Sequence, residues 1–245
     1  MQEKTILDKA KKVYQSCTSY SDCGLADLID RNGNVIEQLK FRTEFQRPDF
    51  FRFDWQDYGP NRGKTQLLST LWFDGSKAIM RRFAADMTEV ELPSLGQSLS
   101  LVTGCSAGAV SIIAPLLFDY SLGGPKHILE LTQPKIVAEE QNHYVLEGSI
   151  LQENDLKLWI SSHNFSVLKV ERCSIMSGSD LKAAHDEFVA REERMAKLLG
   201  RAMLANSLSA GGFADKKNTT RYSFSEIRIG DKVDVATLGY SPLAT

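Results

Sequence analysis

Few residues of this chain have the type and spacing that catalysis needs. The stretch GCSAG at 104–108 offers two nucleophiles, Cys105 and Ser106, but it lacks a preceding strand and an evident base. The four histidines, at positions 127, 143, 163 and 185, lie far apart in the sequence, and no H-E-x-x-H, G-x-S-x-G, P-loop or G-x-G-x-x-G motif occurs. We therefore predict that the protein is not an enzyme, with a hydrolase as the weaker alternative.

Cysteines and acidic residues give no clearer site. The chain has four cysteines: Cys17, Cys23, Cys105 and Cys173. They form no C-x-x-C pair, so the sequence indicates neither a zinc site nor a cofactor. Their even number permits two disulfides, with Cys17–Cys23 as the easiest local pair, while free buried thiols fit the sequence equally well. Asp22 and Asp27 are interpreted as solvated charges on a strand rather than as acid–base groups.

Composition excludes one class of partner and leaves the compartment open. The formal net charge of −2 gives no basic footprint for nucleic acid. With 42% hydrophobic and 24% charged residues over 245 positions, the chain resembles an ordinary globular protein with a sizeable core. The first residues, MQEKTILDKAKKVYQ, lack the apolar core of a secretory signal. The chain is either cytosolic or a mature protein whose signal has been removed.

One long apolar segment decides how the chain is organised. No charged side chain occurs between Glu91 and Asp119, which is long enough for a membrane span. Within 98–118, however, five Ser or Thr residues, two glycines and Pro115 interrupt the apolar residues, and no Lys/Arg cluster flanks the segment. We expect no transmembrane segment but one or two short helices, at 95–104 and 107–118. Their predicted buried residues are Leu99, Val102, Ile112, Ile113, Leu116 and Leu117.

Alternating side chains predict strands on both sides of that segment. After a helix at 3–17, apolar and charged residues alternate from Tyr20 to Phe83, with an Asn-Gly turn in RNGN at 31–34. The inward series is Leu39, Phe41, Thr43 and Phe45, followed by Phe51, Phe53 and Trp55. Further strands are expected at 134–141, 143–152, 155–162, 165–175 and 219–229, with a second amphipathic helix at about 179–205.

This order of elements predicts an α+β fold and a single domain, 1–245. The sheet would be antiparallel and curved, with the helices of 95–118 on its concave, apolar face. Such a face can enclose a cavity for an apolar ligand or be filled as a solid core, and the pattern does not separate the two.

Arg47 stands out because it continues the inward series after Phe45. An arginine there needs carboxylates or free carbonyls, such as those that end a helix. Alternatively, the strand ends at Gln46 and Arg47 points to solvent.

Four stretches resemble the LolA/LolB-like superfamily of periplasmic lipoprotein carriers, in particular its outer-membrane lipoprotein-sorting-like branch. FRTEFQRPDFFRF at 41–53 is similar to the strand–Arg-Pro–strand signature of that group, and LWFDGSKAIMRR at 71–82 to its Asp-Gly turn. LKLWISSHNFSVLKVERCSI at 156–175 resembles its Leu-Trp-Ile hairpin, and TTRYSFSEIRIGDKV at 219–233 its closing strand. The tail lacks the usual Phe before its closing Pro, and the helix at 179–205 is longer than simple carriers need.

The resemblance implies an incomplete antiparallel β-barrel, or half-barrel, whose helices cover an apolar concave face. It implies that Arg47 bonds to the covering helix and latches a lid formed by 95–118. It also implies a periplasmic protein that carries lipid or lipoprotein acyl chains, with membrane proteins of the envelope as further partners. A sensor or interaction module on the same fold is the alternative. The expected cavity-lining residues are Leu39, Phe41, Phe45, Phe51, Phe53, Trp55, Val102, Ile112, Ile113 and Leu116.

Overall fold

Three helices and eleven strands make up the described part of the chain. The computed structural model describes residues 2–57, 68–82, 88–118, 127–140, 142–150, 154–176 and 216–231. The helices are α1 (Glu3–Ser16), α2 (Leu95–Cys105) and α3 (Val110–Phe118). The first strands are β1 (Ser19–Ile29), β2 (Val35–Gln46), β3 (Phe50–Asp57), β4 (Leu68–Asp74), β5 (Ala78–Arg82) and β6 (Thr88–Leu92). The later strands are β7 (Thr132–Glu140), β8 (His143–Ile150), β9 (Asn154–Ser161), β10 (Val167–Met176) and β11 (Lys216–Ile229).

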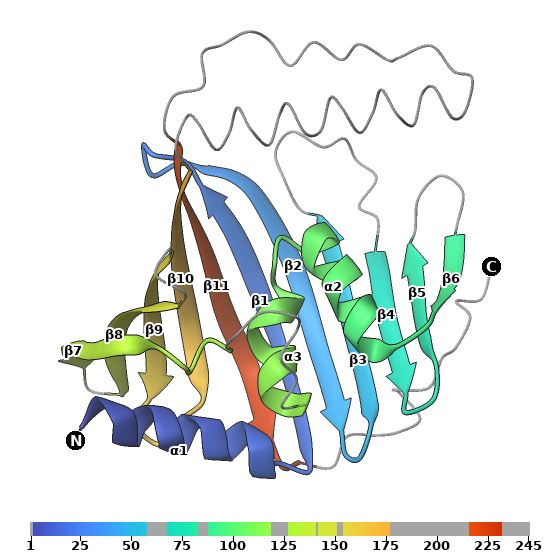
Figure 1. Cartoon of the computed structure of the whole chain (residues 1–245), viewed down its shortest axis with the longest axis horizontal. Coiled ribbons are helices and arrows are strands. Elements are labelled where there is room, and N and C mark those ends of the chain that lie inside the picture. The colour runs from blue at the N-terminus through green and yellow to red at the C-terminus, as the bar shows by residue number, and fades with distance from the viewer. Residues whose placement is uncertain are drawn as a thin grey trace, which may run out of the picture.

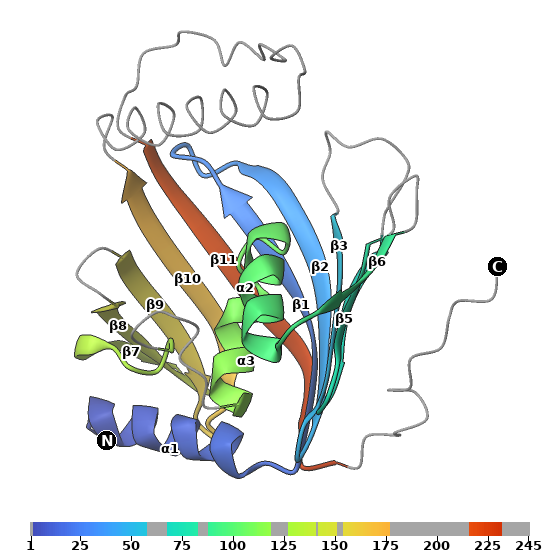
Figure 2. The same cartoon turned by 45° about the vertical axis from the view of Figure 1, so that its right-hand side comes forward.

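All eleven strands belong to one open antiparallel sheet. Their order is β6-β5-β4-β3-β2-β1-β11-β10-β9-β8-β7, so β6 and β7 form the two edges. The last strand, β11, lies between β1 and β10 and joins the two halves of the sheet. The sheet curves around α2 and α3, while α1 lies across one end of it (Figures 1 and 2). The predicted α+β half-barrel with helices on its concave face is confirmed.

Local sequence explains where the elements begin and turn. Asp30 ends β1, and its carboxylate accepts hydrogen bonds from the backbone N–H groups of Asn32 and Asn34, which fixes the predicted hairpin. Ser94 caps α2 by accepting a bond from the N–H of Gln97. No helix in the described ranges is both long and apolar enough to cross a membrane.

The sequence-based boundaries differ from the structure in two places. β6, with the sequence TEVEL, was not predicted; it is only five residues long and pairs with β5 alone. The second apolar helix begins at Val110 rather than 107, because Ala107 and Gly108 adopt positive φ angles of 50° and 81°. The predicted helix at about 179–205 lies outside the described residues.

The concave face has an aromatic line that crosses four strands. Register places Trp55 of β3 beside Phe41 of β2, Phe41 beside Gly24 of β1, and Gly24 beside Phe224 of β11. A Cβ atom on Gly24 would lie 2.1 Å from Cζ of Phe41, so the ring lies directly over the glycine backbone. Gly24 therefore lets the Phe41 ring lie flat on the sheet.

We predict that Gly24→Ala destabilises the fold. The added methyl would push Phe41 away from the rings of Phe53 and Phe224, whose centroids lie 5.8 and 5.6 Å from its own. Such overpacking costs about 1–3 kcal/mol of unfolding free energy, which denaturant unfolding measures. Gly104→Ala is the control, because a Cβ there meets nothing within 4 Å and alanine favours a helix. Equal stability of wild type and Gly24→Ala would show that the ring does not depend on the glycine.

Candidate functional site

The expected cavity-lining residues are brought together on the concave face and in the helices over it. Phe41, Phe45, Phe51, Phe53 and Trp55 are all buried on β2 and β3. Phe41 stacks on Phe53, and Phe53 stacks on Trp55, with both pairs of ring centroids 5.8 Å apart. The other expected residues, Leu39, Val102, Ile112, Ile113 and Leu116, are buried in the same continuous cluster. The structure thus gives an aromatic face that is closed over by helices.

The two helices cover this face with apolar side chains. α2 contributes Leu95, Leu99 and Val102 and packs against β4, β5 and β6. Phe118, at the end of α3, meets Phe45 and Phe51 edge-on, with ring centroids 5.1 and 5.5 Å apart.

A pocket of about 520 Å³ lies elsewhere, among β7–β11, and its lining includes charged residues such as Lys135, Glu147 and Asp155. That pocket is polar and separate from the aromatic face.

Arg47 joins the C-terminal ends of two helices. Its Nε donates to the carbonyl of Cys17 at 2.8 Å, and its Nη2 donates to the carbonyls of Gln15 at 2.8 Å and Tyr14 at 3.3 Å, all at the end of α1. The same Nη2 donates to the carbonyl of Leu117, in α3, at 3.0 Å. A cation at this place complements both helix dipoles and four carbonyls that lack helical partners. The role of Arg47 as a latch stays a prediction.

Tyr222 makes a second polar link between the sheet and the covering segment, which sequence reasoning missed. Its hydroxyl donates to the carbonyl of Ala107, between α2 and α3, at 2.8 Å. Burial raises the pKa of Tyr222 to about 12, so the phenol keeps its donating proton. Tyr222 and Phe224 are two residues apart in β11, so both lie on the concave face. This spacing is the sequence signal that could have indicated an inward-facing Tyr222.

A buried carboxyl group lies beneath the helices. Asp22 is 1% exposed and accepts hydrogen bonds from the hydroxyl of Tyr20 at 2.6 Å and from the N–H of Thr43 at 3.1 Å. The interpretation of Asp22 as a solvated charge is therefore wrong: β1 turns Tyr20, Asp22 and Gly24 toward the concave face. Asp27 lies on the other face and accepts a bond from Gln38.

This carboxyl belongs to a small polar cluster inside the apolar core. The ring of Tyr20 lies 5.5 Å from that of Tyr14 in α1, and the hydroxyl of Tyr14 accepts a bond from the N–H of Val167 at the start of β10. The cluster therefore connects α1, β1, β2 and β10. Burial raises the pKa of Asp22 to about 6, and the bonds from Tyr20 and Thr43 oppose that rise.

Cysteine and serine residues show no catalytic arrangement in the described ranges. The four cysteines are free thiols. Ser106 is fully buried, and its hydroxyl accepts a bond from the N–H of Val110, which shapes the turn between α2 and α3. No group of three or more metal-ligating side chains occurs among the described residues.

We predict that Asp22→Asn changes the pH dependence of stability. Because the folded-state pKa of Asp22 is raised, this group favours folding fully below about pH 4 and loses that contribution as pH rises through about 6. The shift corresponds to roughly 3 kcal/mol. Asparagine cannot ionise, so the stability of the variant relative to wild type should rise by about that amount between pH 4 and 7. Urea unfolding at several pH values measures this, and a difference that does not vary with pH would contradict it.

Comparisons with known proteins return structures but no sequence family. No family model matches the chain, and no curated protein matches it. A LolA superfamily protein from Nitrosomonas europaea aligns over 96% of this chain and 96% of its own, at 11% identity and a TM-score of 0.33. A putative outer membrane lipoprotein-sorting protein domain from Vibrio parahaemolyticus aligns over 97% of both chains, at 10% identity and a TM-score of 0.35.

The Pseudomonas aeruginosa MucA/MucB complex is also similar in structure. The alignment covers 98% of this chain and 61% of the solved chain, at 9% identity and a TM-score of 0.44, so this chain spans less than two thirds of that neighbour. At these identities and TM-scores no ligand or partner carries over.

Proposed function

We propose that this protein binds an apolar ligand with an acyl chain on the concave face of the half-barrel and carries it through the periplasm. The observation that supports this most directly is the aromatic face itself. Five aromatic side chains of β2 and β3 lie side by side there, and helices rather than a second sheet cover them. The proposed compartment and the lipoprotein class of ligand rest on the sequence motifs at 41–53 and 156–175.

An acyl chain is the ligand that could replace a covering helix on this face. Lifting α2 would remove Leu95, Leu99 and Val102 from their apolar contacts. Each buried side chain of this kind contributes about 1.5–3 kcal/mol, so opening would cost roughly 5–9 kcal/mol. One buried methylene returns about 0.8 kcal/mol, so about 6–11 methylenes would offset that cost. A long acyl chain meets this requirement, whereas a small apolar metabolite does not.

We predict binding of fatty acids with a chain-length threshold. Displacement of a fluorescent fatty acid should be weak for chains of up to about 6 carbons and should strengthen steeply beyond about 10, following the contribution of each methylene. Isothermal titration should give a negative heat-capacity change, the sign of apolar burial. Absence of binding across fatty acids, phospholipids and acylated peptides would mean that the aromatic face is a solid core and would overturn the proposed function.

We further predict that Arg47→Leu loosens the end of α3 without unfolding the sheet. Arg47 donates both to the carbonyl of Leu117 and to carbonyls at the end of α1, and leucine removes these bonds. A charge-assisted bond contributes about 1.5–3 kcal/mol, with the lower end expected here because Arg47 is partly exposed to solvent. Hydrogen exchange across 110–118 should rise, and ligand retention should change with it.

Two controls separate the geometry of Arg47 from its charge. Arg47→Lys keeps the charge but cannot reach both helix ends with a planar fork, so it should fall between wild type and leucine. Arg31→Leu removes a cation from the exposed β1–β2 turn and should leave exchange at 110–118 unchanged. If wild type and Arg47→Leu protect 95–118 equally, Arg47 is not a latch.

A further inference from the structure

The two covering helices differ in how they are held, and this difference locates the binding site. We propose that α3 is a fixed part of the core and that α2 alone lifts, so that the ligand lies against β4–β6, which α2 covers, in place of α2. This inference rests on the proposed function and narrows it to one part of the concave face. That part includes Leu71 of β4, and the neighbouring strand β3 places Phe53 beside Leu71 and Trp55 beside Ser69.

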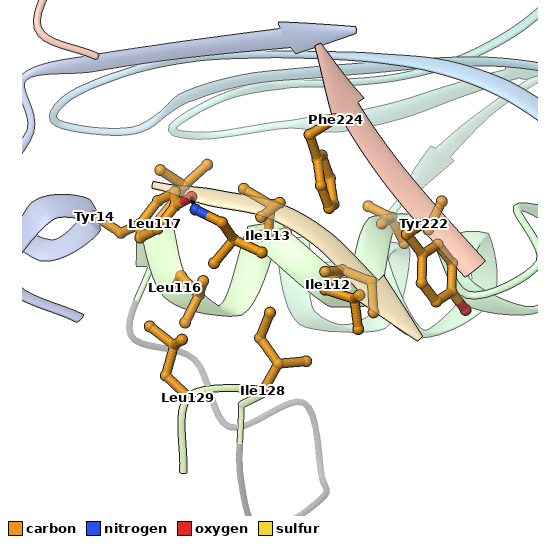
Figure 3. Packing of buried hydrophobic residues seen from close by; sticks show 14 of the residues in the cluster. Tyr14, Ile112, Ile113, Leu116, Leu117, Ile128, Leu129, Tyr222 and Phe224 are labelled. Carbon is orange, nitrogen blue, oxygen red and sulfur yellow. Dashed lines mark hydrogen bonds between the residues drawn. The ribbon is translucent and has the colours of Figure 1, made fainter. Parts of the chain in front are cut away.

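Burial separates the helices first. Seven of the nine residues of α3 are buried: Val110, Ile112, Ile113, Ala114, Pro115, Leu116 and Leu117. A helix that is apolar on all sides belongs to a core. In Figure 3, α3 residues lie among Tyr14, Ile128, Leu129, Tyr222 and Phe224, which come from three other segments. Moving α3 would therefore expose apolar surface on every side.

α2 is an amphipathic surface helix by contrast. Leu95, Leu99 and Val102 face the sheet, whereas Leu101 is 46% exposed and Gln97 and Ser100 face solvent. Lifting α2 uncovers one stripe of the helix, the sheet beneath it and the part of α3 that α2 contacts. This stripe and that part of the sheet are the surfaces an acyl chain would occupy.

Polar attachments show the same asymmetry. Two carbonyls of the covering segment accept hydrogen bonds from the sheet: Ala107 from Tyr222, in the turn between α2 and α3, and Leu117 from Arg47, near the C-terminal end of α3. Within the described ranges, α2 makes no side-chain hydrogen bond to the sheet. Its three hydroxyls donate to carbonyls of the same segment, four residues earlier in each case: Ser98 to Ser94, Ser100 to Gly96 and Thr103 to Leu99.

A hinge separates the part that lifts from the part that is held. The positive φ angles of Ala107 and Gly108 end the α2 geometry, and Tyr222 holds this turn on the sheet. Gly108 is needed there, because a Cβ would lie 2.7 Å from the Tyr222 hydroxyl. At the other end, Pro93 and Ser94 connect α2 to the short edge strand β6. α2 can thus rotate between two non-helical connections while α3 keeps its bonds.

Hydrogen exchange on the unaltered protein tests this division. Amides of 97–105 should exchange more than about tenfold faster than those of 112–118, and a bound fatty acid should raise exchange in α2 while leaving α3 unchanged. Tyr222→Phe removes only the hydroxyl, so exchange in the first turn of α3 should then rise toward that of α2. Joint exchange of α2 and α3 in wild type, or deprotection of α3 by the fatty acid, would overturn the proposal.

A brominated chain locates the ligand directly. In a Trp72→Phe, Trp159→Phe background, where Trp55 is the remaining tryptophan, dibromostearate should quench fluorescence and stearate should not. Displaceable binding of the fluorescent fatty acid without quenching of Trp55 would overturn the placement beneath α2 and leave the proposed function standing. Absence of any fatty-acid binding would overturn both.

Discussion

One guanidinium group bonds the ends of two helices to the sheet. An open sheet with an apolar concave face must be covered, and the cover consists of helices whose C-terminal carbonyls need donors. Arg47 supplies donors to the ends of α1 and α3 together, at 2.8–3.3 Å. Its position directly after β2 ties both helix ends to the sheet strand that carries Phe41 and Phe45. Both helix ends are thus hydrogen-bonded to the same point on the sheet.

Beneath that point, the core combines apolar burial with a few polar groups that have defined partners. Asp22, Tyr20 and Tyr14 sit among apolar side chains; Asp22 and Tyr14 each make a hydrogen bond to another element, and Tyr20 donates to Asp22 within β1. Burying such groups is favourable only when they are satisfied, so they fix how α1, β1 and β10 meet. Apolar contacts alone, as between α2 and β4–β6, hold an element without fixing its position as strictly.

Local pattern predicted most of the fold. Apolar and charged side chains that alternate along the chain predicted the strands and the inward series from Leu39 to Trp55. Gly and Pro residues within 95–118 argued against a membrane span. The burial of Asp22 could also have been predicted from the sequence, because Tyr20, Asp22 and Gly24 are spaced two residues apart and therefore lie on the same face of the strand. The partner of Tyr222 could not, since it depends on β11 lying between β1 and β10, nearly two hundred residues from β1 in the sequence. For Arg47, the sequence predicted carbonyls at the end of a covering helix, such as that of Leu117, but not the carbonyls at the end of α1. The short β6 carries too few residues for a periodic signal.

The place of β11 has a consequence for how the chain acquires its structure. Tyr20 pairs with Ile229, and Ile29 with Thr219, so the strand at the middle of the sheet comes from the far end of the sequence. During synthesis, the two flanking meanders can form hairpins, but nothing can join them until β11 emerges from the ribosome. Pairing over such a separation is slow, because a long loop must close first. The growing polypeptide is therefore kept from completing this sheet until residues 216–229 have been made.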